Sequence, residues 1–184
     1  MNALETILAE VRQVLERMDD GQLERLAAGL LAAPRVFVTG EGRSGFMAKA
    51  FAMRLAHLGL PVAVLGETTT PPVTRGDTLV AVSGSGTTHG TVHAARTAAD
   101  QGARVVAVTT DEQSPLARLA DHTLVVPAAT KWRRQGEAAT AQPLGSLFDQ
   151  ACHLALDAVC LHLARRTGTG TGNRQARAQH ASIE

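Results

Sequence analysis

The sequence predicts a three-layer α/β domain in which five short parallel strands form one sheet with helices on both faces. Short apolar segments alternate along the chain with longer segments of helical periodicity, and this alternation is typical of strand–helix–strand units. Because such units are joined by right-handed crossovers, we expect the strand order 2-1-3-4-5. A chain of 184 residues with 45% apolar but only 3% aromatic residues suits one compact domain with a core of Ala, Val and Leu.

Two amphipathic helices are expected before the first strand, over residues 2–18 and 23–31. Apolar residues such as Leu4 and Leu8 recur on one stripe of the first helix, and a stripe of this kind has to be buried. We therefore expect residues 1–33 to pack on the core or on a neighbouring subunit.

The other elements follow from the same alternation. Residues 34–166 are expected to form the domain, and Leu154 is expected on the buried face of its last helix. Residues 167–184 open with a Gly-Thr repeat and are expected to form a flexible linker and a C-terminal tail. The expected strands cover residues 35–39, 62–65, 78–82, 104–108 and 122–127, and the expected helices cover residues 46–57, 88–101 and 146–166, with a short helix starting near residue 114.

A glycine- and serine-rich turn ends the third expected strand. Gly84 and Gly86 allow the backbone to bend and to approach a ligand closely. The free N–H groups of the next helix and the positive end of its dipole favour a phosphate. The turn lacks both the Gly-Lys-Ser/Thr ending of a nucleotide loop and the G-x-G-x-x-G pattern, so we expect a phosphate on something smaller than a nucleotide. The alternative is an ordinary strand-to-helix turn. The hydroxyl donors in this turn are Ser83, Ser85, Thr87 and Thr88.

A second glycine-rich turn, residues 40–45, follows the first expected strand. Since the carboxyl ends of parallel strands meet at one edge of a sheet, the two turns are expected to face one crevice. Arg43 lies in this turn, where its guanidinium can pair with a phosphate or polarise a carbonyl. The alternative for Arg43 is a solvent-exposed surface arginine.

Composition argues against several classes of function. A net charge of +1 gives no reason to expect a nucleic acid or an anionic membrane as partner. No apolar run approaches the roughly 20 residues of a membrane span, and the N-terminus lacks the apolar segment of a signal peptide. Cys152 and Cys160 lie roughly 12 Å apart along one expected helix, too far for a mutual disulfide. We interpret them as small buried residues of a reducing cytoplasm.

Three histidines and a basic loop are further candidate sites. His89 and His93 have the i, i+4 spacing of zinc-binding helices, but Gly90 replaces the usual glutamate and no third ligand stands out, so no metal is expected. His122 is interpreted as a strand-edge residue. The charged loop 131–137, which contains the single tryptophan, is interpreted as solvated.

Four segments together resemble the 6-phospho-3-hexuloisomerase family of the sugar isomerase (SIS) domain superfamily. The glycine- and serine-rich turn at residues 83–86, here called the serine loop, alone indicates only the superfamily. The last five residues, HASIE, resemble the family's His-Ala-Asn-Leu-Glu ending more loosely. The four segments are GRSGFMAKAFAMRL (42–55), GETTTP (66–71), SGSG (83–86) and QPLGSLF (142–148).

The resemblance implies a flavodoxin-like SIS domain that converts D-arabino-3-hexulose 6-phosphate to fructose 6-phosphate through a cis-enediol(ate). This step follows formaldehyde fixation in the ribulose monophosphate pathway, which implies a functional link to 3-hexulose-6-phosphate synthase. It also implies a cytoplasmic homotetramer with a small sugar phosphate as ligand, no redox cofactor and no obligatory metal. Arg43 is expected to stabilise the developing oxyanion. The expected substrate- and phosphate-binding residues are Ser44, Glu67, Ser83, Gly84, Ser85, Thr87 and Thr88.

The catalytic base is the main departure from the family. Relatives carry a glutamate where this chain has Asp149, which is one methylene shorter. Asp149 is the first choice, and Glu67 and His180 are the alternatives. His180, on the tail, is also expected to carry protons at the mouth of a neighbouring subunit's active site.

Two other functions remain open. One is a different SIS aldose–ketose isomerase, acting for example on a heptose or arabinose phosphate. The other is a non-catalytic sugar-phosphate sensor like the SIS transcription regulators. Those regulators carry a helix-turn-helix domain in front, for which the roughly 33 residues before the first strand are expected to be too few.

Overall fold

The computed structural model describes residues 2–133 and 137–168, and its centre is a five-stranded parallel sheet in the order β2-β1-β3-β4-β5. The predicted strand order is therefore confirmed. Residues Val36, Thr78 and Arg104 pair across β1, β3 and β4, so the strands begin and end nearly level. The strands are β1 (Val36–Gly40), β2 (Val62–Val64), β3 (Thr78–Val82), β4 (Arg104–Thr109) and β5 (His122–Val125).

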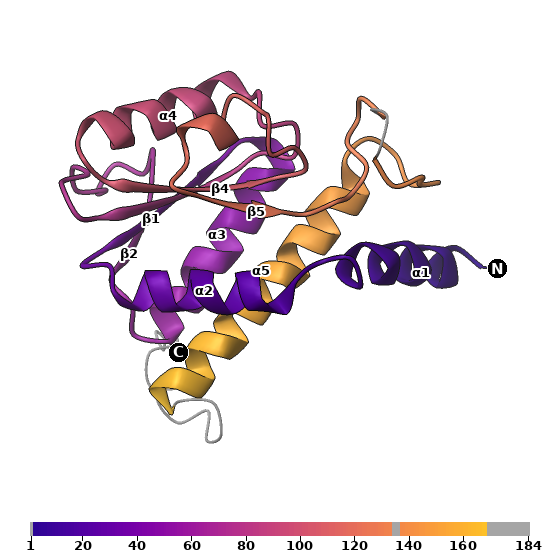
Figure 1. The fold of residues 1–184 in the computed structure, drawn as a ribbon, viewed down its shortest axis with the longest axis horizontal. Helices are drawn as coiled ribbons and strands as arrows, with labels where there is room; N and C mark the ends of the chain where they lie inside the picture. The colour runs from indigo at the N-terminus through magenta and orange to yellow at the C-terminus, as the bar shows by residue number, and fades with distance from the viewer. Residues whose placement is uncertain (1, 134–136, 169–184) are drawn as a thin grey trace.

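Helices cover both faces of the sheet and complete the predicted three layers. The larger apolar cluster joins one face of the sheet to α1, α2, α3 and α5, and a smaller cluster joins the other face to α4. Figure 1 shows α4 on one side of the strands and α2, α3 and α5 on the other, with α1 projecting from the body. The helices are α1 (Ala3–Leu15), α2 (Asp20–Leu31), α3 (Gly42–His57), α4 (His89–Asp100), the 3₁₀ helix η1 (Ala117–Leu119) and α5 (Ser146–Thr167).

The central strand and the last helix are built from small and branched apolar residues. All five residues of β3 are buried, as expected for a strand covered on both faces. Helix α5 packs against α1, α2 and α3, and it has no single apolar stripe because several neighbours surround it. Cys152 and Cys160 are buried and unbridged, and burial raises the pKa of both thiols.

Three helix starts and one burial expectation differ from the sequence prediction, and α1 ends at Leu15 rather than at residue 18. Helix α2 begins at Asp20 because the Asp19 side chain accepts the N–H of Gly21. Helix α3 begins at Gly42, four residues before the expected start, and the short helix covers residues 117–119. Leu154, which was expected on the buried face of α5, is 44% exposed. On α1, Leu4 is 73% and Leu8 68% exposed, so the core of this chain does not cover them.

None of the helices in the described part of the chain has the length and apolar character that crossing a bilayer demands.

Candidate active site

The two predicted glycine turns meet at one cavity of about 400 Å³ at the carboxyl ends of the strands. The turn after β1 contributes residues 41–44, and the loop after β3 contributes Gly84, Ser85 and Thr88. The wall is completed by the segment after β5 and by the first turn of α5, including Phe148 and Asp149. Residues more than 100 positions apart in the sequence therefore share one site.

Three helix N-termini without side-chain caps surround this cavity. The N-cap residues of α3, α4 and α5 are Glu41, Thr88 and Gly145; all three line the cavity, and none makes a side-chain capping hydrogen bond. By contrast, α1 and α2 are capped by the side chains of Asn2 and Asp19. The first turns of α3, α4 and α5 thus keep N–H groups and positive dipole ends for a ligand, and an anion is the ligand they favour.

The serine loop after β3 is fixed from the end of β4. The Gly84 carbonyl accepts hydrogen bonds from the Thr110 N–H at 3.1 Å, the Thr110 hydroxyl at 2.9 Å and the Thr109 hydroxyl at 3.2 Å. Gly86 has φ +62°, a conformation that favours glycine. The hydroxyls of Ser83 and Thr88 lie 2.9 Å apart in a hydrogen bond across the loop. The loop is therefore held in shape by the protein itself.

The serine loop also lies directly against α5. A Cβ on Gly84 would be 2.9 Å from Cδ1 of Phe148, closer than real side chains come, so only glycine fits there. Phe148 is the residue before Asp149. The phosphate-favouring loop and the carboxylate are consequently packed at a fixed separation.

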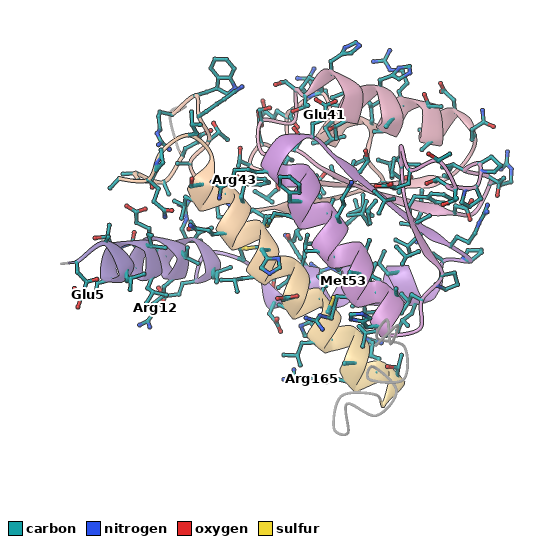
Figure 2. The ribbon with its side chains drawn as sticks, turned by 180° about the vertical axis from the view of Figure 1, so that it is seen from behind. Glu5, Arg12, Glu41, Arg43, Met53 and Arg165 are labelled. Atoms are coloured by element: carbon teal, nitrogen blue, oxygen red, sulfur yellow. The ribbon has the colours of Figure 1, made fainter. Side chains whose placement is uncertain are left out.

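Asp149 is the buried carboxylate of the site, with 5% of its surface exposed. Arg43 Nε lies 3.1 Å from its Oδ2, and the Ser44 hydroxyl donates to its Oδ1 at 3.2 Å. Arg43 Nη1 also donates to the Ser146 hydroxyl at 3.1 Å, so α3 and α5 are linked at their first turns (Figure 2). Burial raises the pKa of Asp149, and the Ser44 hydrogen bond and the Arg43 charge offset only part of that rise. A carboxylate in this state is a stronger base than one in water.

Some residues expected at the site lie outside the cavity wall. Glu67 is exposed and paired with Lys49 at 2.8 Å, and that hydrogen bond lowers the pKa of Glu67. Thr87 is exposed and donates its hydroxyl to Ser85 Oγ at 2.9 Å. Ser83 is 2% exposed and reaches the site through Thr88. His180 lies outside the described residues.

Lys131 lines the cavity. The sequence analysis interpreted its loop as solvated and did not include Lys131 in the site. Its ammonium group lies 4.8 Å from the centre of the Trp132 ring. The loop is held by Glu137, whose carboxylate accepts the N–H of Thr130 at 2.7 Å and its hydroxyl at 2.6 Å. The available signal was position, because this segment follows the carboxyl end of β5, where the other site loops also begin.

A metal site is not assembled by the histidines of α4. The rings of His89 and His93 stack with centroids 6.4 Å apart. Across residues 2–133 and 137–168, no three His, Cys, Asp or Glu side chains are grouped so as to hold a metal ion.

Comparisons with known proteins place this arrangement in a family. The model of the SIS domain family matches residues 29–153. The chain is 42% identical over 183 residues to 3-hexulose-6-phosphate isomerase of Mycobacterium gastri, covering 100% of this chain and 90% of that protein. It is 36% identical over 178 residues to 3-hexulose-6-phosphate isomerase of Bacillus subtilis, covering 97% and 95%.

A solved structure agrees with these relatives. A hypothetical protein of Methanococcus jannaschii, for which a molecular function of 3-hexulose-6-phosphate isomerase has been inferred, superposes with a TM-score of 0.85. Its sequence is 25% identical, and the match covers 100% of both chains. The fold, the matched residues and the full-length relatives lead to one conclusion: this chain belongs to the SIS domain family.

Proposed function

We propose that this protein isomerises D-arabino-3-hexulose 6-phosphate to fructose 6-phosphate. The observation that carries the proposal is Asp149, a buried carboxylate with a raised pKa beside three uncapped helix N-termini. The names of the full-length relatives support this substrate over other sugar phosphates.

The reaction moves the carbonyl group from C3 to C2 of the sugar. Asp149 removes the proton from C2, and the electron pair forms a C2–C3 double bond while negative charge develops on O3. The resulting cis-enediolate takes up a proton on O3 and loses the proton on O2, and the proton held by Asp149 returns to C3, which leaves a C2 carbonyl and a C3 hydroxyl. Hydrogen lost at C2 is regained at C3, so the reaction requires no external oxidant or reductant. A base with a raised pKa suits both transfers, because it binds the proton more strongly than an ordinary carboxylate does.

Arg43 is the proposed counter-ion for the enediolate. Its Nε and Nη1 contact Asp149 and Ser146, and its second terminal nitrogen, Nη2, has no hydrogen-bond partner among the described residues. When Asp149 takes the proton, its charge disappears while negative charge grows on the sugar. The guanidinium is then adjacent to the new anion without having to move, and such preorganisation is the most effective form of electrostatic catalysis.

The phosphate group is proposed to bind at the N-terminus of α4. Ser85 and Thr88 line the cavity there, and the helix supplies free N–H groups. Ser83 acts through its hydrogen bond to Thr88. Lys131 adds a cation to the same cavity.

A homotetramer in the cytoplasm is proposed as the working form. Leu4 and Leu8 expose most of their apolar surface on α1, which is the arrangement expected where a second subunit covers a helix. His180 is proposed to carry protons at a neighbouring site. The substrate is proposed to come from 3-hexulose-6-phosphate synthase in the ribulose monophosphate pathway.

A substrate panel tests the proposed reaction. Fructose 6-phosphate formation from 3-hexulose 6-phosphate is measured with a coupled dehydrogenase assay, beside arabinose 5-phosphate and a heptose 7-phosphate. Turnover of the hexulose alone supports the proposal. Turnover of another sugar phosphate identifies a different SIS isomerase, and binding without any turnover identifies a sensor.

A double variant tests the phosphate site. Ser83→Ala with Ser85→Ala removes one direct hydroxyl and the support of Thr88, and each hydrogen bond lost to a charged group is worth about 1.5–3 kcal/mol. KM is expected to rise at least tenfold with an unchanged fold by circular dichroism. The matched control is Thr97→Ala, which removes an exposed hydroxyl on α4 away from the cavity wall. A double variant that binds fructose 6-phosphate as tightly as the parent contradicts the assignment.

A further inference from the structure

A second polar cavity lies at the amino ends of the strands, whereas the candidate active site lies at their carboxyl ends. It has a volume of about 410 Å³ and is bordered by α2 and by the first residues of three adjacent strands, Thr78, Arg104 and His122. We call it the amino-edge pocket. None of the residues that line the active-site cavity lines it, so the two sites are separate.

Two arginines line the amino-edge pocket, Arg25 from α2 and Arg104 from the start of β4. Arg104 Nη1 lies 3.8 Å from the position that a Cβ on Gly29 would occupy. Arg25 precedes Gly29 by four residues on the same face of α2, and its guanidinium extends toward Asp19 at the start of that helix. Gly29 leaves open the space that a side chain would otherwise fill.

The positive charge in the pocket is only partly neutralised. Arg104 has no ion pair or side-chain hydrogen bond within the described ranges. Arg25 pairs with Asp19 at 3.3 Å, but both side chains are about 60% exposed (64% and 59%), and exposed pairs of this kind hold their partners weakly. Asp121 is the one acid on the wall, and its Oδ2 already accepts the N–H of Val105 at 2.8 Å.

A buried imidazole nitrogen completes the donor set. Nε2 of His122 is buried and has no hydrogen-bond partner among the described protein atoms. Burial, together with the charge of Arg25, lowers the pKa of His122 and so favours the neutral ring, which carries one N–H. An unpaired buried polar atom is unfavourable, and a ligand oxygen at this position would satisfy it.

We propose that the amino-edge pocket binds inorganic phosphate or a small phosphate monoester between Arg25, Arg104 and His122. Donors from three residues exceed what the two oxygens of a carboxylate can use, whereas a tetrahedral anion offers an oxygen to each. Asp121 has a second oxygen that accepts the P–O–H proton of a monoprotonated phosphate. Sulfate has no such proton at neutral pH, so the pocket distinguishes these two anions. The proposal does not depend on the proposed isomerase activity.

The ring signals of His122 in long-range ¹H–¹⁵N spectra of the full-length protein report on this pocket alone. Inorganic phosphate is expected to shift them saturably, and sulfate to bind at least tenfold more weakly. Glycerol 2-phosphate forms a second arm: a saturable shift shows that the pocket admits esters, and no shift restricts it to the free ion. His122 signals that do not respond to either phosphate overturn the proposal, and equal affinity for sulfate overturns the role of Asp121.

Two pocket variants and one control variant test whether the phosphate binds specifically in the amino-edge pocket. Arg104→Gln is expected to weaken phosphate binding roughly 10- to 100-fold, since it removes charge-assisted hydrogen bonds. Gly29→Leu fills the pocket without removing any charge and should abolish the shift. Arg96→Gln removes one exposed positive charge on α4 and should titrate like the parent. Parental affinity in Arg104→Gln, or equal losses in Arg104→Gln and Arg96→Gln, would mean that no specific site exists here.

Discussion

Two arginine–aspartate pairs stand at opposite ends of β1, and the pKa values of their aspartates are shifted in opposite directions. Asp77, before β3, pairs with Arg35 at 2.7 Å; Asp149, on α5, pairs with Arg43 at 3.1 Å. Both aspartates are buried, with 1% and 5% of their surfaces exposed. Burial raises the pKa of each carboxyl, yet the pKa of Asp77 is lowered and that of Asp149 is raised.

The number of donors explains this difference. Asp77 receives two hydrogen bonds from Arg35 at 2.7 and 3.0 Å, and two more from the N–H and hydroxyl of Thr74 at 2.7 and 3.0 Å. Among the described residues, the Asp149 carboxylate receives one hydrogen bond, from the Ser44 hydroxyl, and one ion pair, from Arg43. A fully paired buried carboxylate stabilises the fold, while a partly paired one keeps its basicity.

Asp77→Ala is expected to destabilise the protein by about 3–5 kcal/mol, because it leaves Arg35 without its buried partner. Urea unfolding followed by circular dichroism measures the loss. Asp100→Ala, at the exposed end of α4, is the matched control and should lie within about 0.5 kcal/mol of the parent. A loss below about 1 kcal/mol for Asp77→Ala would mean that its four hydrogen bonds add little to stability.

Asp149→Asn is expected to lower kcat by about 10²-fold or more, since the amide keeps the shape but accepts no proton. Asp149→Glu should retain activity, because the related enzymes are expected to use a glutamate here. Asp157→Asn, on the exposed side of the same helix, is the control. A near-normal kcat in Asp149→Asn would transfer the role to Glu67 or His180, and truncation after Thr167 then decides between those two.

Ser44→Ala tests the effect of donor number on the pKa of Asp149, because it removes one of the two donors to that carboxylate. Its hydrogen bond lowers the pKa of Asp149, so its loss should raise that pKa further. The base works only when deprotonated, and the acidic limb of the pH profile of kcat/KM should therefore move to higher pH. A profile that keeps its acidic limb while activity falls uniformly would mean that the limb belongs to another group.

Stability as a function of pH gives the smallest effect and separates the two pairs by sign. Asp149 has a folded pKa above its unfolded value, so its ionisation destabilises the fold; the penalty develops as pH rises from the unfolded pKa and is complete above the folded pKa. Asp149→Asn should then be more stable than the parent at pH 7 by roughly 0.5–2 kcal/mol, and the gain should vanish in acid.

Asp77 behaves in the opposite way. Its folded pKa is below its unfolded value, so its stabilisation is present above the unfolded pKa and is lost as pH falls through the folded pKa. Urea titrations of the parent, Asp149→Asn and Asp77→Ala at several pH values measure both trends. An Asp149→Asn variant less stable than the parent at pH 7 would place Asp149 with the structural pairs.

The fold was predictable because local patterns determine it. The bounds of β3 and the order of the sheet follow from apolar strands joined by helical crossovers. The start of α3 was misjudged because Gly42, with φ +58°, has the signature of a turn although it begins the helix. Leu154 was misplaced because burial on α5 depends on neighbouring helices, which periodicity alone does not identify.

The site was predictable only in part. Arg43, Ser44 and Asp149 were named individually, but the hydrogen bond between Ser44 and Asp149 joins residues 105 positions apart, and no local pattern reveals it. Lys131 was missed because a charged loop has the same composition whether it lines a cavity or faces water.

If the proposed reaction is correct, the contact between Gly84 and Phe148 is expected to set which substrate lengths the site accepts. In the proposed reaction, the loop that contains Gly84 holds the phosphate, and the residue after Phe148 removes the proton. Since the two segments touch, the span from phosphorus to the reacting carbon cannot adjust to a shorter or longer sugar. A displacement of 1 Å at a reacting centre can cost about 10² in rate. The fixed separation between the Gly84 backbone and the Phe148 ring is thus expected to restrict the number of sugar carbons between the phosphate and the carbonyl.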